Sequence, residues 1–387
     1  MAGLIGQLTA ATLAARIDAD APITVVDTRP PDSFAAWHIP GAISVPYHPH
    51  DGLSAARTWA DVERTVSTAA ETAIVCGKGV SSTALGLELA RRGHDDIAVV
   101  TGGMQAWSAV YHTVTLPTEA ADLRVIQLQR RAKGCLGYLI GDPTAGRAIA
   151  VDVSQHTGVA LRAAAAAGLR IEAVIDTHVH ADHISGGRTL AAEVGVPYQL
   201  SADAADRGVT TAYTPLAAGD RLRVGAVTID VLAAPGHTSE QIALLVAERM
   251  LVSADALFTD GVGRTELQFG DADAEHGAAL LYETLHDRLG ALDDAVWVLP
   301  GHVALDPDRG MVGATPDAPI MRQLGEVRAT VPLLGADRGA FIAAVSGDAP
   351  AKPPNYREII ELNLGERGID RTEAITLELG PNNCAAS

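Results

Sequence analysis

The chain has 387 residues, of which 48% are hydrophobic and only 4% aromatic, and its formal net charge is −18 at pH 7. This length allows two domains and exceeds one ordinary hydrophobic core. The negative charge argues against nucleic acid and anionic membrane surfaces as partners. No segment approaches the run of about 20 apolar residues that a membrane-spanning helix needs. With no basic leader and only three scattered cysteines, we expect a reduced, cytoplasmic protein.

Residues 1–112 alternate short apolar strands with helices, which predicts a parallel α/β domain. The expected strands are 23–27, 42–45, 73–76 and 97–101, and the expected helices are 8–16 and 81–92. Thr9 is the expected N-cap of the first helix. We call this segment the N-terminal domain.

Cys76 ends one of these strands, and the loop Gly77-Lys-Gly-Val-Ser-Ser82 leads from it directly into the next helix. Glycines let the loop fold tightly, so that its amides and the helix N-terminus can surround an anion. Lys78 adds a positive charge, and such surroundings lower the pKa of a thiol. A cysteine that ends a strand is more often a small core residue, but this loop favours Cys76 as a nucleophile.

Four motifs of the N-terminal domain resemble the rhodanese (sulfurtransferase) family. They are Val25-Val-Asp-Thr-Arg29, His38-Ile-Pro-Gly-Ala42, the Cys76 loop and Gly102-Gly-Met-Gln-Ala-Trp107. The resemblance implies that Cys76 carries a sulfane sulfur as a persulfide. It also implies that Lys78 faces an anionic sulfur donor such as thiosulfate.

After an expected linker over 113–122, the pattern changes to many strands with few helices. Helices are expected at 157–167, 185–194 and 272–289. This pattern predicts a second domain over 123–315, with two sheets sandwiched between helices; because of the motif described next, we call it the metal domain. A helical extension of the same domain is expected over 316–387, including a last helix over 356–363.

The stretch Thr177-His-Val-His-Ala-Asp-His183 carries the strongest chemical signal in the chain. It places His178, His180, Asp182 and His183 within six positions, and imidazole and carboxylate are the side chains that bind transition metals. It follows a short buried strand and precedes a helix, so a rigid scaffold presents it on a loop. The pattern predicts a metal site.

Three further metal-competent residues, His237, Asp255 and His302, each follow a strand-like run. Their succession after the HxHxDH stretch resembles the metallo-β-lactamase superfamily, whose αββα sandwich gathers these loops at one edge. The resemblance implies two metal positions with Asp255 between them: one formed by His178, His180 and His237, the other by Asp182, His183 and His302. The residues leave open whether the site is dinuclear or mononuclear.

Further segments resemble the persulfide dioxygenases. These are Gly263-Arg-Thr-Glu-Leu-Gln268, Pro353-Pro-Asn-Tyr-Arg-Glu-Ile-Ile360, Asn363-Leu-Gly365 and Gly134-Cys135.

The resemblance to the persulfide dioxygenases implies one iron(II) per chain, held by His178, His237 and Asp255, with open positions for dioxygen and substrate. Other residues are implied to orient these ligands: His180, Asp182, His183 and His302. Arg264 and Thr265 are implied to bind the carboxylates of glutathione. Cys135 is implied to be a buried structural thiol.

The combined expectation is a sulfurtransferase fused to a dioxygenase. Cys76 would exchange sulfane sulfur between thiosulfate and a thiol, and the iron site would oxidise glutathione persulfide with O2 to sulfite and glutathione. The alternative is a glyoxalase-II-like thioester hydrolase with zinc or two metal ions, and a third class is a non-enzymatic persulfide sensor. The sequence leaves open the thiol used, the direction of sulfur flow, a homodimeric state and the role of Cys384.

Overall fold

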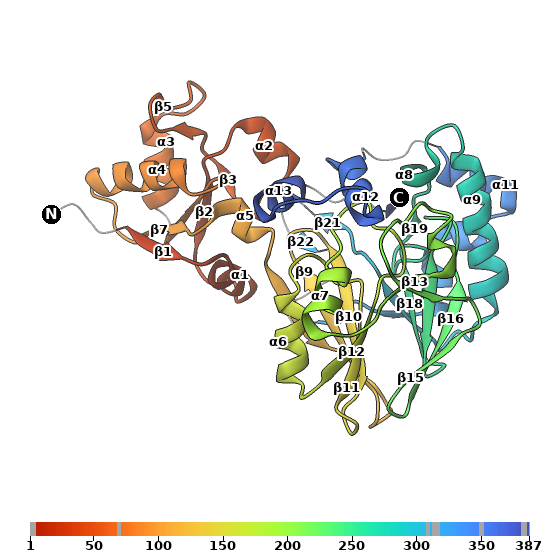
Figure 1. Cartoon of the computed structure of the whole chain (residues 1–387). Coiled ribbons are helices and arrows are strands. Elements are labelled where there is room, and N and C mark those ends of the chain that lie inside the picture. The colour runs from red at the N-terminus through yellow and green to blue at the C-terminus, as the bar shows by residue number, and fades with distance from the viewer. Residues whose placement is uncertain are drawn as a thin grey trace.

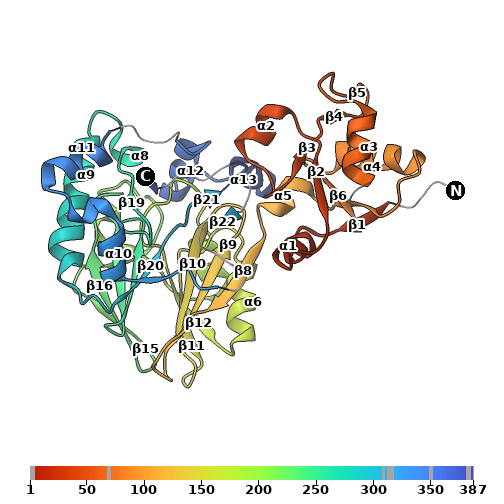
Figure 2. The same cartoon turned by 180° about the vertical axis from the view of Figure 1, so that it is seen from behind.

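The computed structural model describes residues 5–67, 71–306, 310–311, 318–347, 352–380 and 385–386, so Cys384 lies outside the described residues. The chain forms a smaller N-terminal body and a larger second body (Figures 1 and 2). In both views α13 (Arg371–Leu377) lies beside α5 (Gly103–Trp107), near the junction of the two bodies. Within the described ranges no helix has the length and apolar character that crossing a membrane requires.

The N-terminal body contains a five-stranded sheet in which every pairing is parallel. Its strands, in spatial order, are β1 (Gly6–Leu8), β7 (Ile97–Val100), β6 (Thr72–Val75), β2 (Thr24–Asp27) and β3 (Ile43–Ser44). Apolar clusters cover both faces, as expected for a parallel sheet with buried strands. The predicted parallel α/β domain is confirmed.

Helices lie on both faces of this sheet. One face packs against α1 (Ala10–Asp18) and α5, and the other against α3 (Trp59–Ser67) and α4 (Val80–Arg91). Thr9 caps α1 as expected, since its side chain accepts a hydrogen bond from the Thr12 amide at 3.0 Å. The three-residue strand β1 was not predicted, because it is too short to show a period of two. A short helix, α2 (Pro31–Ala36), follows β2.

The second body is a sandwich of two sheets. The first sheet consists, in spatial order, of β14 (Thr214–Leu216), β13 (Tyr198–Ser201), β12 (Arg170–Ile175), β11 (Arg147–Val151), β10 (Cys135–Asp142), β9 (Arg124–Arg130) and β8 (Tyr111–Thr115). The second sheet consists of β15 (Arg221–Val224), β16 (Val227–Ala233), β17 (Ile242–Val246), β18 (Met250–Ala254), β20 (Trp297–Pro300) and β23 (Arg322–Gln323).

The main core lies between these sheets, where side chains such as Tyr138 and Val151 of the first sheet cluster with Ile229 and Leu244 of the second. Helices cover the two outer faces. The first sheet carries α6 (Gly158–Ala166) and α7 (Gly187–Val194), and the second carries α9 (Ala274–Glu283), α10 (Leu324–Thr330) and α11 (Arg338–Val345). The predicted αββα architecture is confirmed.

Two expectations need correction. The linker predicted over 113–122 begins inside β8, which pairs antiparallel with β9 and so belongs to the metal domain. The α-helix predicted over 272–289 is shorter than expected, because α9 ends at Glu283. The chain then continues as a π-helix over Thr284–Arg288 and a 3₁₀ turn over Leu289–Ala291. Thr284 Oγ1 donates to the carbonyl of Pro235 at 2.6 Å, which ties this segment to the turn before His237.

The C-terminal extension is largely helical, as expected, and its end returns to the edge of the sandwich where β19 lies (Figure 1). It contains α10, α11, α12 (Tyr356–Leu364) and α13, together with β24 (Ala385–Ala386) paired to β19 (Val262–Gly263). Between β19 and α9 lies the short helix α8 (Glu266–Phe269).

Candidate metal centre and cysteine loop

The HxHxDH stretch follows β12, and buried side chains hold its backbone in place. The Asp152 carboxylate accepts hydrogen bonds from the Thr177 amide at 2.7 Å and from the Thr177 hydroxyl at 2.8 Å. Glu240 Oε1 accepts a hydrogen bond from the Val179 amide at 2.8 Å. All four metal-competent residues of the stretch are buried. The loop is therefore fixed before any ion binds, as a metal site requires.

His178, His237 and Asp255 form the first group that the structure brings together. His178 Nε2 lies 3.9 Å and His237 Nε2 lies 3.6 Å from Asp255 Oδ2. His237 Nδ1 donates to the Arg264 carbonyl at 2.7 Å, and His178 Nδ1 faces Thr177 Oγ1 at 2.9 Å. Each Nε2 is thereby turned toward Asp255.

Within the described part of the chain, His178 Nε2 and Asp255 Oδ2 have no hydrogen-bond partner. Buried polar atoms are normally paired, so unpaired nitrogen and oxygen atoms that face one another fit the coordination of a metal ion. Burial lowers the pKa of His178 well below its usual value, and the neighbouring His180 and His237 add to this effect. His178 is therefore neutral, which is the form that binds a metal.

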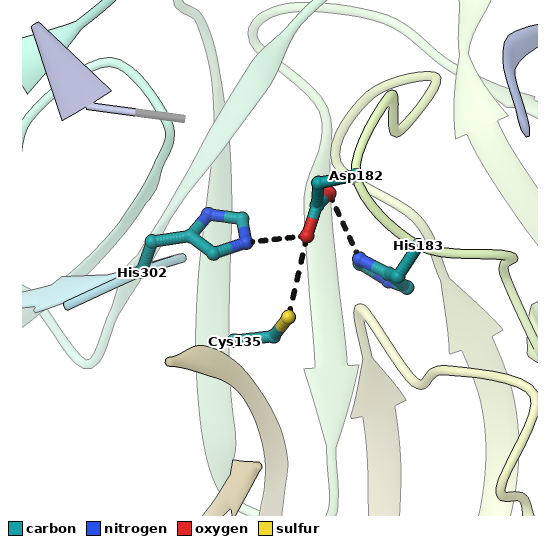
Figure 3. A group of neighbouring side chains, drawn as sticks. All are labelled: Cys135, Asp182, His183 and His302. Atoms are coloured by element: carbon teal, nitrogen blue, oxygen red, sulfur yellow. Dashed lines mark hydrogen bonds and ion pairs between the residues drawn. The ribbon is translucent and has the colours of Figure 1, made fainter. Parts of the chain in front are cut away.

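Figure 3 shows a second buried group, formed by Cys135, Asp182, His183 and His302. Asp182 is its centre. Its Oδ1 lies 3.0 Å from His183 Nδ1, and its Oδ2 lies 2.9 Å from His302 Nε2 and 3.2 Å from Cys135 Sγ. Burial and the Asp182 charge raise the pKa of Cys135, but hydrogen bonds from His183 and His302 outweigh them and bring it to about 7.

His302 links the two groups. Its Nδ1 lies 2.7 Å from Asp255 Oδ1, while its Nε2 faces Asp182. Burial raises the pKa of Asp255, but the charge and hydrogen bond of His302 outweigh this and lower it. Asp255 is therefore ionised, with Oδ1 engaged by His302 and Oδ2 facing the first group.

The ring of His180 lies between the two groups, 4.2 Å from the ring of His178 and 4.1 Å from that of His183, and its ligand atom faces Asp152 and Asp176. Its Nε2 is 3.3 Å from Asp152 Oδ1, and neither ring nitrogen has a hydrogen-bond partner among the described residues. The structure thus divides the four residues that the sequence grouped together. Asp182, His183 and His302 converge, whereas His180 faces the carboxylates at the ends of β11 and β12.

Arg264 and Thr265 both have internal partners. The Arg264 guanidinium is 1% exposed and pairs with Glu266, and the Thr265 hydroxyl donates to the Ala274 carbonyl at 3.1 Å. The Arg264 carbonyl orients His237, as described above. These contacts favour a role in holding the loop, and the predicted grip on glutathione stays a prediction.

In the N-terminal domain, Cys76 lies in the loop between β6 and α4 and is 4% exposed. Its Sγ accepts a hydrogen bond from the Gly79 amide at 2.9 Å and lies 3.3 Å from Ser82 Oγ. Burial opposes ionisation, but hydrogen bonds from Ser82, Ser81 and Gly79 outweigh it and lower the pKa of the Cys76 thiol. Lys78 is exposed at the rim of this loop. The loop can stabilise a thiolate.

The Gly102-Gly103 pair explains how this loop is held. The Met104 amide donates to the Cys76 carbonyl at 2.8 Å, and a Cβ on Gly103 would lie 2.2 Å from the same oxygen. Gly103 also has a φ of +56°, which disfavours other residues. The motif therefore allows α5 to approach the back of the cysteine loop.

Several supporting residues were not predicted. Asp152, directly after β11, and Glu240, just before β17, hold the metal loop, and Asn363 and Glu378 hold it from the C-terminal extension. Lone acidic or amide residues carry no local pattern, so no sequence signal identified them.

Comparison with protein families agrees with this geometry. The rhodanese-like domain family matches residues 9–110, and the metallo-beta-lactamase superfamily matches residues 131–302. The chain therefore belongs to the metallo-beta-lactamase superfamily, and it carries a rhodanese-like domain ahead of its metal domain.

Two kinds of relative share the metal domain. A hydroxyacylglutathione hydrolase of Methylobacterium sp. (strain 4-46) is 30% identical over 57% of this chain and 89% of its own. The mitochondrial persulfide dioxygenase ETHE1 of Homo sapiens is 29% identical over 43% of this chain and 62% of its own. The crystal structure of ETHE1 from Myxococcus xanthus is 29% identical with a TM-score of 0.53, covering 62% of this chain and 96% of that one.

Proposed function

We propose that the protein is a persulfide dioxygenase with a rhodanese-type sulfurtransferase domain. The observation that carries this proposal is the group of His178, His237 and Asp255, in which both histidine Nε2 atoms lie within 3.9 Å of Asp255 Oδ2. Among the described residues, His178 Nε2 and Asp255 Oδ2 have no hydrogen-bond partner. Two imidazoles and one carboxylate on one side of an ion form the ligand set of non-haem iron(II) oxygenases, which leaves positions for dioxygen and substrate. Iron supplies electron chemistry that zinc lacks.

The chain's own residues orient this group. The Arg264 carbonyl fixes the His237 tautomer with Nε2 as the free lone pair, and His302 holds Asp255 so that only Oδ2 faces the histidines. Such supporting hydrogen bonds tune ligand basicity and geometry. The proposed overall reaction consumes one persulfide, one dioxygen and one water, and yields one thiol and one sulfite with two protons.

The N-terminal domain would supply or remove sulfane sulfur. The Cys76 thiolate attacks the outer sulfur of thiosulfate, so that an S–S bond forms on Cys76 and the sulfur–sulfur bond of thiosulfate breaks with release of sulfite. A low-molecular-weight thiolate then takes the outer sulfur and leaves as a persulfide. The hydrogen bonds that stabilise the thiolate and the exposed Lys78 support this role.

The second candidate is a thioester hydrolase with two metal ions, because hydroxyacylglutathione hydrolases are among the relatives. Both kinds of relative act on glutathione-linked or persulfide substrates by name, so a small-molecule thiol is the common expectation. The engagement of Asp255 Oδ1 by His302 favours the single-iron reading, since an aspartate that bridges two ions benefits from both oxygens.

The test is oxygen uptake by protein purified anaerobically with iron(II), after addition of glutathione persulfide. Uptake with matching sulfite release supports the proposal, and Asp255→Ala should abolish both while Cys76→Ser keeps them. Hydrolysis of a glutathione thioester without oxygen uptake would favour the second candidate. Absence of both activities in protein shown to contain iron would overturn both.

A further inference from the structure

A cavity of about 240 Å³ lies on the outer side of the second sheet, where α9 and α10 stand far from the N-terminal body (Figures 1 and 2). Its walls come from the segment after β18, from the π-helix and 3₁₀ turn after α9, and from α10 with the 3₁₀ turn that follows it. We propose that this cavity takes up dioxygen for the metal centre, an inference that rests on the proposed dioxygenase activity. Five leucines line it: Leu257, Leu285, Leu289, Leu324 and Leu334.

The polar side chains of the lining offer little to water or to a charged ligand. Arg328 reaches the cavity, but its Nη2 donates to two backbone carbonyls at 2.8 and 3.1 Å and its Nη1 pairs with Asp294. His286 Nδ1 donates to the Tyr282 carbonyl at 3.0 Å, so Nε2 is the one polar atom left on that ring. An ordered water needs about two to four polar partners, and apolar cavities of about 150 Å³ stay dry and bind xenon. The cavity therefore suits a small apolar molecule.

The walls of the cavity are attached to the loops that carry the proposed iron ligands. Leu257 stands two residues after Asp255. Thr284, the first residue of the π-helix, donates to the Pro235 carbonyl at 2.6 Å, two residues before His237. π-Helices are rare and are frequently found at functional sites. The cavity is thus built against the back of two of the three residues proposed to hold iron.

An apolar cluster continues from the cavity to the metal centre. Leu257 belongs to the same buried cluster as Val262 and Leu281. Val262 directly precedes Gly263, where an added Cβ would lie 3.3 Å from His237 Cβ. A small apolar molecule crosses such packing when side chains change rotamer, whereas the cost of burying a charge excludes a persulfide anion.

Of the two proposed co-substrates, dioxygen alone has the chemistry of this cavity, because it is small, uncharged and apolar. An apolar group the size of one methylene gains about fourfold in concentration when it moves from water to an apolar site. Dioxygen is of comparable size, so the cavity raises its concentration beside the metal centre by a factor of that order. The cavity therefore lowers the KM for dioxygen and leaves the KM for the persulfide unaffected.

The first part of the test is a crystal of the full-length wild-type protein under xenon pressure, since xenon is an apolar probe of similar size. We expect xenon between Leu257 and Leu334, and no xenon there in Leu334→Trp, whose larger side chain fills the cavity. Ordered water in the cavity, or a wild-type cavity without xenon, would overturn the proposal. This part needs no enzymatic activity and no variant that folds.

The second part measures oxygen uptake against dioxygen concentration with glutathione persulfide as the substrate. In Leu334→Trp the KM for dioxygen should rise about fourfold, with kcat and the KM for the persulfide unchanged. Leu333→Trp is the matched control, because Leu333 precedes it in the same 3₁₀ turn and does not line the cavity. Leu334→Phe takes the place of Leu334→Trp if the larger side chain prevents folding.

The outcomes separate this inference from the function on which it rests. Oxygen uptake with an unchanged KM for dioxygen in Leu334→Trp, or an equal rise in both variants, would refute the role of the cavity and leave the dioxygenase standing. Absence of oxygen uptake by iron-loaded wild-type protein would refute the proposed function, and the role of the cavity with it.

Discussion

Gly301 offers a direct test of how the Asp255 carboxylate is held. A Cβ added to Gly301 would lie 2.3 Å from Asp255 Oδ1 and 3.1 Å from the Ala254 carbonyl carbon. The backbone cannot easily move away, because the Gly301 amide donates to the Ala254 carbonyl at 2.8 Å and β20 pairs with β18. In Gly301→Ala the carboxylate must therefore move, by about 1 Å to reach ordinary contact distance.

That movement breaks the 2.7 Å contact between Asp255 Oδ1 and His302. Loss of a hydrogen bond that supports a ligand lowers metal affinity by about 10–100-fold, which corresponds to about 1.4–2.7 kcal/mol. The crowding itself costs about 1–3 kcal/mol of folding stability. We therefore expect Gly301→Ala to fold, with a modestly lower melting temperature and a large loss of metal binding.

The assay is competitive titration of Fe²⁺ or Co²⁺ into metal-free protein, with thermal unfolding measured on the same sample. Gly335→Ala is the matched control, since it adds the same methyl group where no atom lies within 4 Å. Wild-type metal affinity in Gly301→Ala would show that Asp255 is not held as described. An equal loss in both variants would assign the effect to glycine replacement in general.

Three further predictions concern the other sites. Asp255→Ala should lose iron and oxygen uptake and keep sulfur transfer from thiosulfate; loss of both in a folded variant would contradict two independent sites. Because the pKa of Cys76 is lowered from 9.0, its alkylation rate measured against pH should have a midpoint below 9, so that the thiolate persists as the pH falls; a midpoint at or above 9 would remove the support for an activated nucleophile. Arg130→Met should cost about 3–5 kcal/mol of unfolding free energy in denaturant titrations, because it leaves the buried Glu378 charge without its ion-pair partner. The control is Arg64→Met at an exposed ion pair, which should cost under about 1 kcal/mol of unfolding free energy. Equal losses of unfolding free energy in the two variants would show that burial does not make the Arg130–Glu378 pair more important than an exposed pair.

The compact motifs made the metal ligands predictable. His178, His180, Asp182 and His183 lie within one loop, so their shared chemistry is visible without a fold. The distribution of these four residues over separate groups of side chains could not be predicted, because it depends on which carboxylate each imidazole contacts in the folded chain. His180 turns to Asp152 at the end of β11 only once the parallel pairing of β11 and β12 sets the two loops side by side.

Cys135 shows the same limit. The resemblance to the persulfide dioxygenases implies a buried structural thiol at Cys135, and Cys135 is buried. Its approach to Asp182 depends on long-range pairing with the segment around His302, 167 residues further along the chain. A short motif cannot encode contacts between segments so far apart, because they depend on the register of the whole sandwich.

The role of the C-terminal extension is likewise visible only in the folded structure. The Asn363 side chain donates to the carbonyls of His180 and His183 at 2.8 and 2.9 Å and accepts the Ser185 amide at 2.9 Å. These groups would otherwise be buried backbone atoms without partners, which cost about 1–3 kcal/mol each. The extension is therefore part of the metal site rather than an appendage to it.

One buried ion pair joins this extension to both domains. Glu378 accepts the Ile184 amide at 2.6 Å, directly after the metal loop, and pairs with Arg130 at 2.7 Å. Arg130 in turn donates to the Ser108 carbonyl at 2.8 Å, at the end of the helix whose first turn supports Cys76. Arg130 and Glu378 are 0% and 1% exposed, so neither can exchange its partner for water without opening the junction. The metal loop and the helix behind the cysteine loop are thus fixed by the same pair of side chains, which sets the relative position of the two reactive loops.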